Sequence, residues 1–194
     1  MTMAQALPGA GRARRAEKPG HASGFTLLEI AVVLLLMGLI MTLALPYFGG
    51  VAQARLKSQA RALAALADYM AVRAQTEKLV LRLTFDLDRD GYFTSCLDPY
   101  ARAPVFRPCS GPGSSGKRLP PDLRIRDVSV AGVGTARRGA ICTLFYPEGY
   151  TDATVVHLAN QSGSTLTLCL SPFATGASIF GADLPAARAL ALAQ

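Results

Sequence analysis

The sequence predicts an α+β fold in which a long N-terminal helix packs on an antiparallel β-sheet domain. Three features indicate it: residues 25–45 are almost entirely apolar, residues 46–78 carry a helical stripe, and residues 79–182 alternate with a period of two between Pro- and Gly-rich turns. The 194 residues, of which 51% are hydrophobic, suffice for one membrane helix and one modest globular domain. Residues 1–24 read as a leader and residues 183–194 as a tail with one short helix at most.

The apolar run from Phe25 to Leu45 contains a single ionisable side chain, that of Glu29. With about 1.5 Å of rise per residue, a helix of this length spans the roughly 30 Å hydrocarbon core of a bilayer. A carboxylate in that setting costs on the order of a few kcal/mol unless a partner neutralises it. We therefore expect Glu29 to have a partner, unless it lies close enough to the interface to reach water.

Gly24, the residues Phe25-Thr26-Leu27-Leu28-Glu29 and the apolar run together resemble the class III signal of type IV pilins and type II secretion pseudopilins. The resemblance implies that a prepilin peptidase cuts after Gly24 and methylates the new N-terminus on Phe25, so that the apolar helix is retained. It also implies that Glu29 pairs with the terminal amino group of a neighbouring subunit. Filament assembly and charge neutralisation would then occur together.

The leader is basic, and the positive-inside rule places it in the cytoplasm. This predicts a single-pass protein of the bacterial inner membrane with a periplasmic C-terminal domain. A secretory signal peptide is the competing interpretation, but Thr42 and Ala44 make a poor cleavage site. The net charge of +7 is partly the leader's and is not by itself typical of nucleic-acid binding.

The second part of the helix, residues 46–78, begins at Pro46, whose ring is expected to kink the axis. Its apolar residues recur at spacings of three and four, which predicts one buried stripe: Leu56, Ala60, Leu63, Ala67, Met70 and Ala74. We expect this stripe to pack on the β-domain.

The β-domain is predicted from 79 to 182 as a mostly antiparallel sheet, with strands at 79–86, 91–94, 123–130, 140–146, 153–158 and 166–170. Residues 98–121 are rich in proline and glycine and predict a long surface loop. Its basic side chains suit a solvated loop, or else a partner or nucleic acid: Arg102, Arg107, Lys117 and Arg118.

The turn between the first two strands contains Asp86, Asp88 and Asp90 before Gly91. Alternating acids also begin a calcium loop, but the twelfth position, which needs a bidentate acid, holds Leu97. We favour a β-hairpin with an Asp-Gly turn over a calcium site.

All four cysteines follow the apolar run, where an oxidising periplasm permits disulfides. Of three possible pairings we favour Cys96 with Cys109, which closes a short loop, and Cys142 with Cys169, which joins two strands. No C-x-x-C pair occurs and neither histidine flanks a cysteine, which argues against zinc.

The C-terminal third contains Phe145, Pro147 and Gly149 and later Pro172, Thr175 and Gly176. These resemble the F-x-P-x-G and P-x-x-T-G patterns of the GspH/FimT branch of minor pseudopilins and minor pilins. The resemblance implies a structural subunit at or near the tip of a type II secretion pseudopilus, with other pseudopilins, the inner-membrane assembly platform and exported proteins as partners.

Two other functions stay open. The first is a FimT-like minor type IV pilin in pilus assembly or DNA uptake, in which arginines such as Arg137 and Arg138 bind phosphates. The second is a simple signal-anchored periplasmic protein with an uncut leader. We expect no enzyme and no cofactor, because no nucleophile or nucleotide motif is present. His157, which alternates with Val155, is expected to face solvent or the sheet surface.

Overall fold

The structure is a computed structural model that describes residues 25–173 and 176–193, without the side chains of residues 43–51. It separates into two compact units, residues 1–42 and 43–194. Helix α1 (Leu27–Glu77) contributes residues to both. The leader with Gly24 lies outside the described residues. The kink expected at Pro46 falls where side chains are not described, so it stays a prediction.

The amphipathic part of α1 buries the stripe that the sequence predicts. All six of its residues are buried: Leu56, Ala60, Leu63, Ala67, Met70 and Ala74. The helix ends at Glu77, one residue before the predicted boundary, where Lys78 takes a φ of 55°. A left-handed residue directs the chain out of the helix and toward the first strand.

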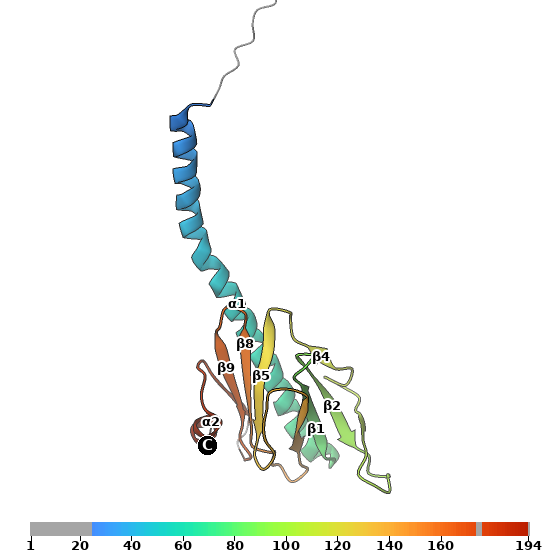
Figure 1. Cartoon of the computed structure of the whole chain (residues 1–194). Helices are drawn as coiled ribbons and strands as arrows, with labels where there is room; N and C mark the ends of the chain where they lie inside the picture. Colours follow the sequence, from blue (N-terminus) through green and yellow to red (C-terminus); the bar gives the residue numbers. More distant parts are fainter. Residues whose placement is uncertain (1–24, 174–175, 194) are drawn as a thin grey trace, which may run out of the picture. The chain divides into compact units, whose positions relative to one another are not determined.

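The strands form two antiparallel sheets instead of the one sheet expected (Figure 1). In order, sheet A contains β3 (Phe106–Pro108), β2 (Gly91–Leu97), β1 (Leu81–Asp86) and β7 (Ala140–Phe145), and β4 (Lys117–Arg118) also pairs with β2. Sheet B contains β10 (Ala177–Phe180), β9 (Thr165–Leu170), β8 (Thr154–Asn160), β5 (Leu123–Val130) and β6 (Gly134–Ala136).

Several predicted strands and turns are confirmed. The β1–β2 hairpin pairs Asp86 with Gly91 across the expected turn. The turn after β7 is closed by the Gly149 N–H, which donates to the Tyr146 carbonyl at 3.1 Å, and Gly149 has a φ of 96°. That conformation favours glycine, which accounts for its place in the turn.

The expectation of a structureless loop over residues 98–121 is wrong, because β3 and β4 lie within it. Strands β6 and β10 were also not predicted. Each of these four strands has two to four residues, too few for a period of two to be recognised.

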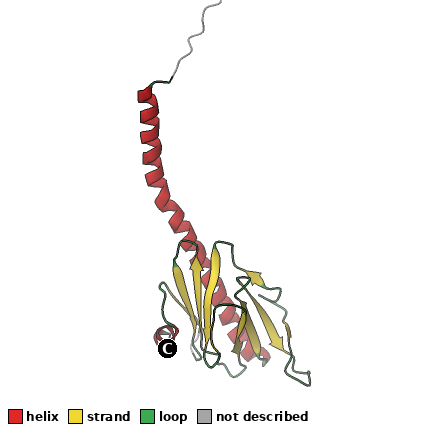
Figure 2. Ribbon diagram, in the orientation of Figure 1, coloured by secondary structure: helices red, strands yellow, loops and turns green. Residues whose placement is uncertain are grey.

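The core lies between α1 and the inner faces of both sheets (Figure 2). Every buried residue of the described chain falls between Leu56 and Ala189. A fragment of residues 52–194 therefore keeps the whole described core, and it is the natural unit for stability measurements.

The tail forms a second helix, α2 (Ala186–Leu192), which packs on β8 and β9. Ala189 of α2 is buried with Val155 and Cys169, apart from the main core. Leu158 of β8 belongs to the main core. Sheet B is therefore covered on both faces, by α1 on one and by the tail on the other.

Candidate functional site

The N-terminal helix segment begins with a polar cap. Thr26 Oγ1 accepts the N–H of Glu29 at 3.2 Å, and the Thr26 carbonyl accepts the N–H groups of Glu29 and Ile30. Threonine at this position satisfies an N–H group that a helix leaves free at its start. A carboxylate in the first turn also interacts favourably with the helix dipole. Phe25 and Glu29 are both exposed at this capped start of the helix.

Apolar side chains cover this segment on all sides, and none of them is buried within the described chain. The exposed fraction is 88% for Leu27 and stays at 45% or above for the large apolar residues through Met41. A helix that is apolar all round is stable only when lipid or protein surrounds it. The segment therefore presents a surface that needs a partner.

Among the described residues, no helix combines the length with the apolar character that crossing a membrane requires.

The predicted disulfide between Cys96 and Cys109 is confirmed. It ties β2 to the end of β3. The predicted pairing of Cys142 with Cys169 is wrong, since both are free thiols. Cys142 lies on β7 of sheet A, whereas Cys169 lies on β9 of sheet B and is buried under α2. The pairing failed because it assumed that both strands belong to one sheet.

The acidic turn forms the hairpin instead of a metal loop. Asp90 Oδ1 accepts the N–H of Ile125 at 2.9 Å, and Asp86 Oδ1 accepts the N–H of Arg89 at 3.1 Å. Within the described part of the chain, no three His, Cys, Asp or Glu side chains lie close enough to hold a metal ion. Two of the three carboxylates, those of Asp86 and Asp90, therefore help to fix the chain path, while Asp88 lies between them in the turn.

A buried polar cluster that sequence reasoning missed lies under the tail. His157 is expected from the sequence to face solvent or the sheet surface; it is only 4% exposed, so it does not face solvent, and it lies on the face of sheet B beneath the tail. Its Nδ1 lies 2.5 Å from Asp127 Oδ1, and its Nε2 lies 2.8 Å from the Leu184 carbonyl oxygen. Arg126 Nε donates to Asp127 Oδ2 at 2.8 Å.

The tail closes this cluster through Asp183. Its two carboxylate oxygens accept from the two terminal nitrogens of Arg126 at 2.5 and 2.7 Å. Thr167 Oγ1 accepts the Leu184 N–H at 3.1 Å. Side chains from β5, β8 and β9 thus fix the chain just before α2.

The charges in this cluster support one another. Burial alone raises the pKa of Asp127, but hydrogen bonds from Arg126 and His157 outweigh it, so the pKa lies below its usual value. The bidentate hydrogen bond from Arg126 lowers the pKa of Asp183. The one sequence cue was the run Thr154–Asn160, which lacks alternation and is typical of a strand buried on both faces.

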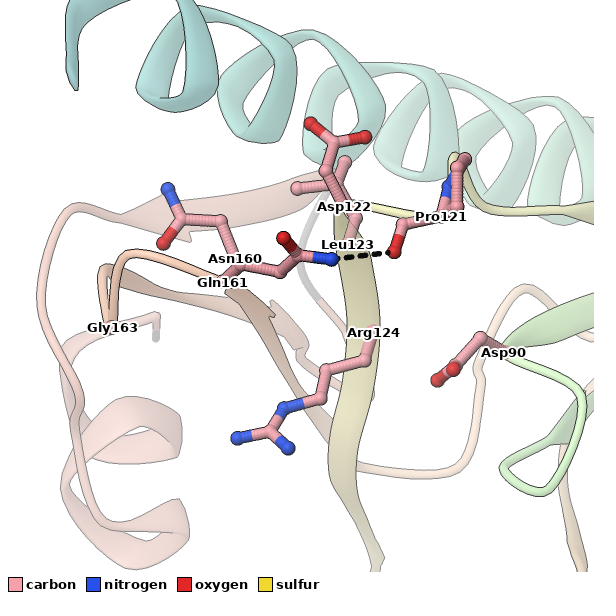
Figure 3. A pocket seen from close by; sticks show the side chains of 8 residues that line it. All are labelled: Asp90, Pro121, Asp122, Leu123, Arg124, Asn160, Gln161 and Gly163. Carbon is pink, nitrogen blue, oxygen red and sulfur yellow. Dashed lines mark hydrogen bonds between the residues drawn. The ribbon is translucent and has the colours of Figure 1, made fainter. Parts of the chain in front are cut away.

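One hollow in the described part of the chain is polar and has a volume of about 450 Å³. Figure 3 shows that the polar ends of Asp90, Asp122 and Arg124 point in different directions. Most of the groups already have partners: Asp90 binds the Ile125 N–H, and Asp122 Oδ2 lies 3.7 Å from the Arg55 guanidinium. The polar side chains that line the hollow therefore do not converge on one position.

The arrangement of a helix against antiparallel sheets is the α+β fold that the sequence predicts. Among solved structures it is similar to the minor pseudopilin EpsH from the type II secretion system of Vibrio cholerae. The TM-score is 0.51 at 8% identity, over 70% of this chain and 99% of that chain. A second structure of EpsH gives a TM-score of 0.46 at 10% identity, over 61% of this chain and 96% of that one.

At this identity the first similarity shows the fold alone, and it confirms that a helix packs on antiparallel sheets as in EpsH. No protein-family model matches the sequence, and no curated protein matches it.

Proposed function

We propose that the chain is a minor pseudopilin, a structural subunit and not an enzyme, which assembles into the short periplasmic filament of a type II secretion system. The observation that carries the proposal is the apolar segment from Phe25 to Met41, whose large side chains are exposed on all sides of the helix. The fold that it shares with EpsH supports the same role.

In this role the apolar segment first lies in the inner membrane and then packs among the helices of neighbouring pseudopilins. A prepilin peptidase removes residues 1–24 and methylates Phe25. Glu29, exposed at the capped helix start, then meets the amino terminus of an adjacent subunit. Neutralising a carboxylate in an apolar setting is favourable enough to fix the axial position of the subunit.

Mass spectrometry of the membrane-extracted protein tests the maturation step. We expect loss of residues 1–24 and addition of one methyl group. A chain that still begins at Met1 would exclude the pseudopilin role and favour a signal-anchored periplasmic protein.

Replacement of the acid tests assembly. Glu29→Gln removes the charge at nearly constant shape and should abolish incorporation into the filament and secretion. The matched control is Glu77→Gln, which removes the carboxylate that pairs with Arg73 at 2.8 Å at the other end of α1 and should leave secretion unchanged. Normal secretion by the Glu29→Gln variant would contradict the proposed mechanism.

The position at the filament tip and the type IV pilus alternative need separate tests. Crosslinking the subunit in assembled filaments would locate it at the tip or along the shaft. For the DNA-uptake alternative, binding of duplex DNA should weaken steeply with added salt and depend on the exposed Arg137 and Arg138. Absence of DNA binding at low salt removes that alternative.

A further inference from the structure

The two sheets differ in how their outer faces are covered. In β1, Leu81, Leu83 and Phe85 belong to the core, and successive side chains of a strand point to opposite faces. Arg82 and Thr84 therefore point to the outer face of sheet A. Sheet B has its outer face covered by α2, which packs on β8 and β9.

A row of three side chains crosses the outer face of sheet A. Thr84 of β1 is directly opposite Phe93 of β2 on one side and Cys142 of β7 on the other. Together with neighbouring residues, this row lines a hollow of about 320 Å³: Arg82, Val133, Ala140 and Ile141. We call this the Thr84 hollow. Its walls are mostly apolar, and Val133, at 71% exposed, forms part of its rim.

The hollow contains a polar group without a partner. Thr84 is 7% exposed, yet its Oγ1 makes no hydrogen bond to any described atom. A buried hydroxyl without a partner costs about 1–3 kcal/mol. An incoming group that donates to or accepts from Thr84 would recover that energy.

Cationic side chains line a second hollow that adjoins the Thr84 hollow at Phe93. They are Arg89, Lys117 and Arg118. The acid there, Asp86, already faces Arg89 at 4.0 Å. With Arg82 in the first hollow, four cationic side chains and one carboxylate line the two hollows. The partner of this surface should therefore be acidic.

We propose that the outer face of sheet A docks an acidic polypeptide segment of another protein, which inserts an apolar side chain into the Thr84 hollow. The side chain contacts Phe93 and Val133, a polar group beside it pairs with Thr84 Oγ1, and acidic residues of the segment lie against Arg89, Lys117 and Arg118. An apolar anchor surrounded by charge is a common design of protein interfaces. A phosphate backbone would use the cations but gain nothing from the apolar hollow.

Fluorescence anisotropy tests the proposal with the full-length chain in nanodiscs of zwitterionic lipid. The probe is a labelled ten-residue peptide of alternating Glu and Leu, compared with a peptide of alternating Glu and Ser and with a labelled single-stranded oligonucleotide. We expect saturable binding of the Glu-Leu peptide, at least about tenfold weaker binding of the Glu-Ser peptide, and weaker binding of both in added salt.

Val133→Asp places a negative charge at the rim and should weaken binding of the Glu-Leu peptide by about tenfold. Tyr100→Asp is the matched control, because Tyr100 is exposed and does not line either hollow. The affinity of the Tyr100→Asp variant for the Glu-Leu peptide should equal that of the wild type. Both substitutions are at exposed loop positions, and unchanged circular dichroism would show that both variants fold.

Three outcomes would overturn the proposal: no binding of the Glu-Leu peptide, equal loss of affinity in the Val133→Asp and Tyr100→Asp variants, or tighter binding of the oligonucleotide than of the peptide at the same face. The test does not depend on filament assembly or secretion. A failure here leaves the pseudopilin role intact, and a failure of leader cleavage leaves this surface intact.

Discussion

Asp127→Asn should be among the most damaging conservative substitutions in the β-domain. Asp127 is 6% exposed and its two oxygens face His157 and Arg126 at 2.5 and 2.8 Å. The substitution keeps the shape but removes the charge that both partners face. Removing one member of a buried ion pair costs about 3–5 kcal/mol. Because the Arg126 side chain is 34% exposed and water can replace its partner, we expect the lower end, about 3 kcal/mol.

Urea unfolding of the fragment 52–194 at pH 7, followed by circular dichroism, measures this loss. Asp122→Asn is the matched control, because Asp122 directly precedes the same strand, β5. Asp122 Oδ2 lies 3.7 Å from an Arg55 side chain that is 62% exposed. Exposed pairs of this kind contribute at most about 1 kcal/mol. For a domain of this size, about 3 kcal/mol lowers the melting temperature by about 6–12 °C.

The pH dependence of the difference gives a second measurement. The pKa of Asp127 is lower in the folded chain than its usual value, which is about 3.9 when unfolded. Its contribution to stability is therefore fully present above about pH 4 and is lost as the pH falls through the folded pKa. The wild-type and Asp127→Asn fragments should approach equal stability in that acidic range.

Trypsin cleavage in the tail gives a third measurement of the same cluster. Arg188 in α2 is exposed, but trypsin cleaves there only when the helix opens. Asp127→Asn weakens the groups that fix residues 183 and 184, so cleavage at Arg188 should become faster than in the Asp122→Asn fragment. Equal stability losses in the two variants at pH 7, or a difference that does not shrink as the pH falls below about 4, would refute this account of the cluster.

Three further outcomes are expected for the same fragment. Gly113→Ala should lose about 1 kcal/mol more stability than Gly132→Ala, because both have positive φ but only the first new Cβ would meet a side chain, at 2.9 Å. Iodoacetamide should modify Cys142 and leave Cys169 unmodified until the protein unfolds, because Cys169 is fully buried and burial raises the pKa of its thiol to about 11. Cys109→Ser should lower the free energy of unfolding by about 3 kcal/mol in urea, since it opens the loop closed over a separation of 13 residues, and an equal effect of reductant on wild type and variant would contradict this.

The sequence predicted the helix and most long strands because their residues carry a strong local pattern. The stripe from Leu56 to Ala74 needed only the helical period, and the β5 strand begins and ends where predicted. A local sequence pattern does not show which strands pair with each other. Cys142 and Cys169 both lie on predicted strands, but only the strand order puts them in different sheets.

The buried cluster could not be predicted for a related reason. Arg126, Asp127, His157 and Asp183 come from two strands and the tail, and no spacing in the sequence links them. The tail was the missing element, since a strand that is solvated on one face would leave His157 exposed. Once α2 covers sheet B, the two ring nitrogens of the buried histidine need hydrogen-bond partners, and Asp127 and the Leu184 carbonyl supply them.

The tail also bears on where this chain can meet other proteins. The tail covers the outer face of sheet B, so that Val155 and Cys169 are not accessible to a partner. Phe93 on β2 of sheet A and Val133 stay exposed. If the tail were the docking element, loss of α2 would abolish partner binding. If it is a structural cover, as the buried ion pair beneath it indicates, the Asp127→Asn variant should lose stability and still bind the acidic peptide at sheet A. Measuring both properties in one variant therefore separates the sheet that holds the fold together from the sheet that is open to partners.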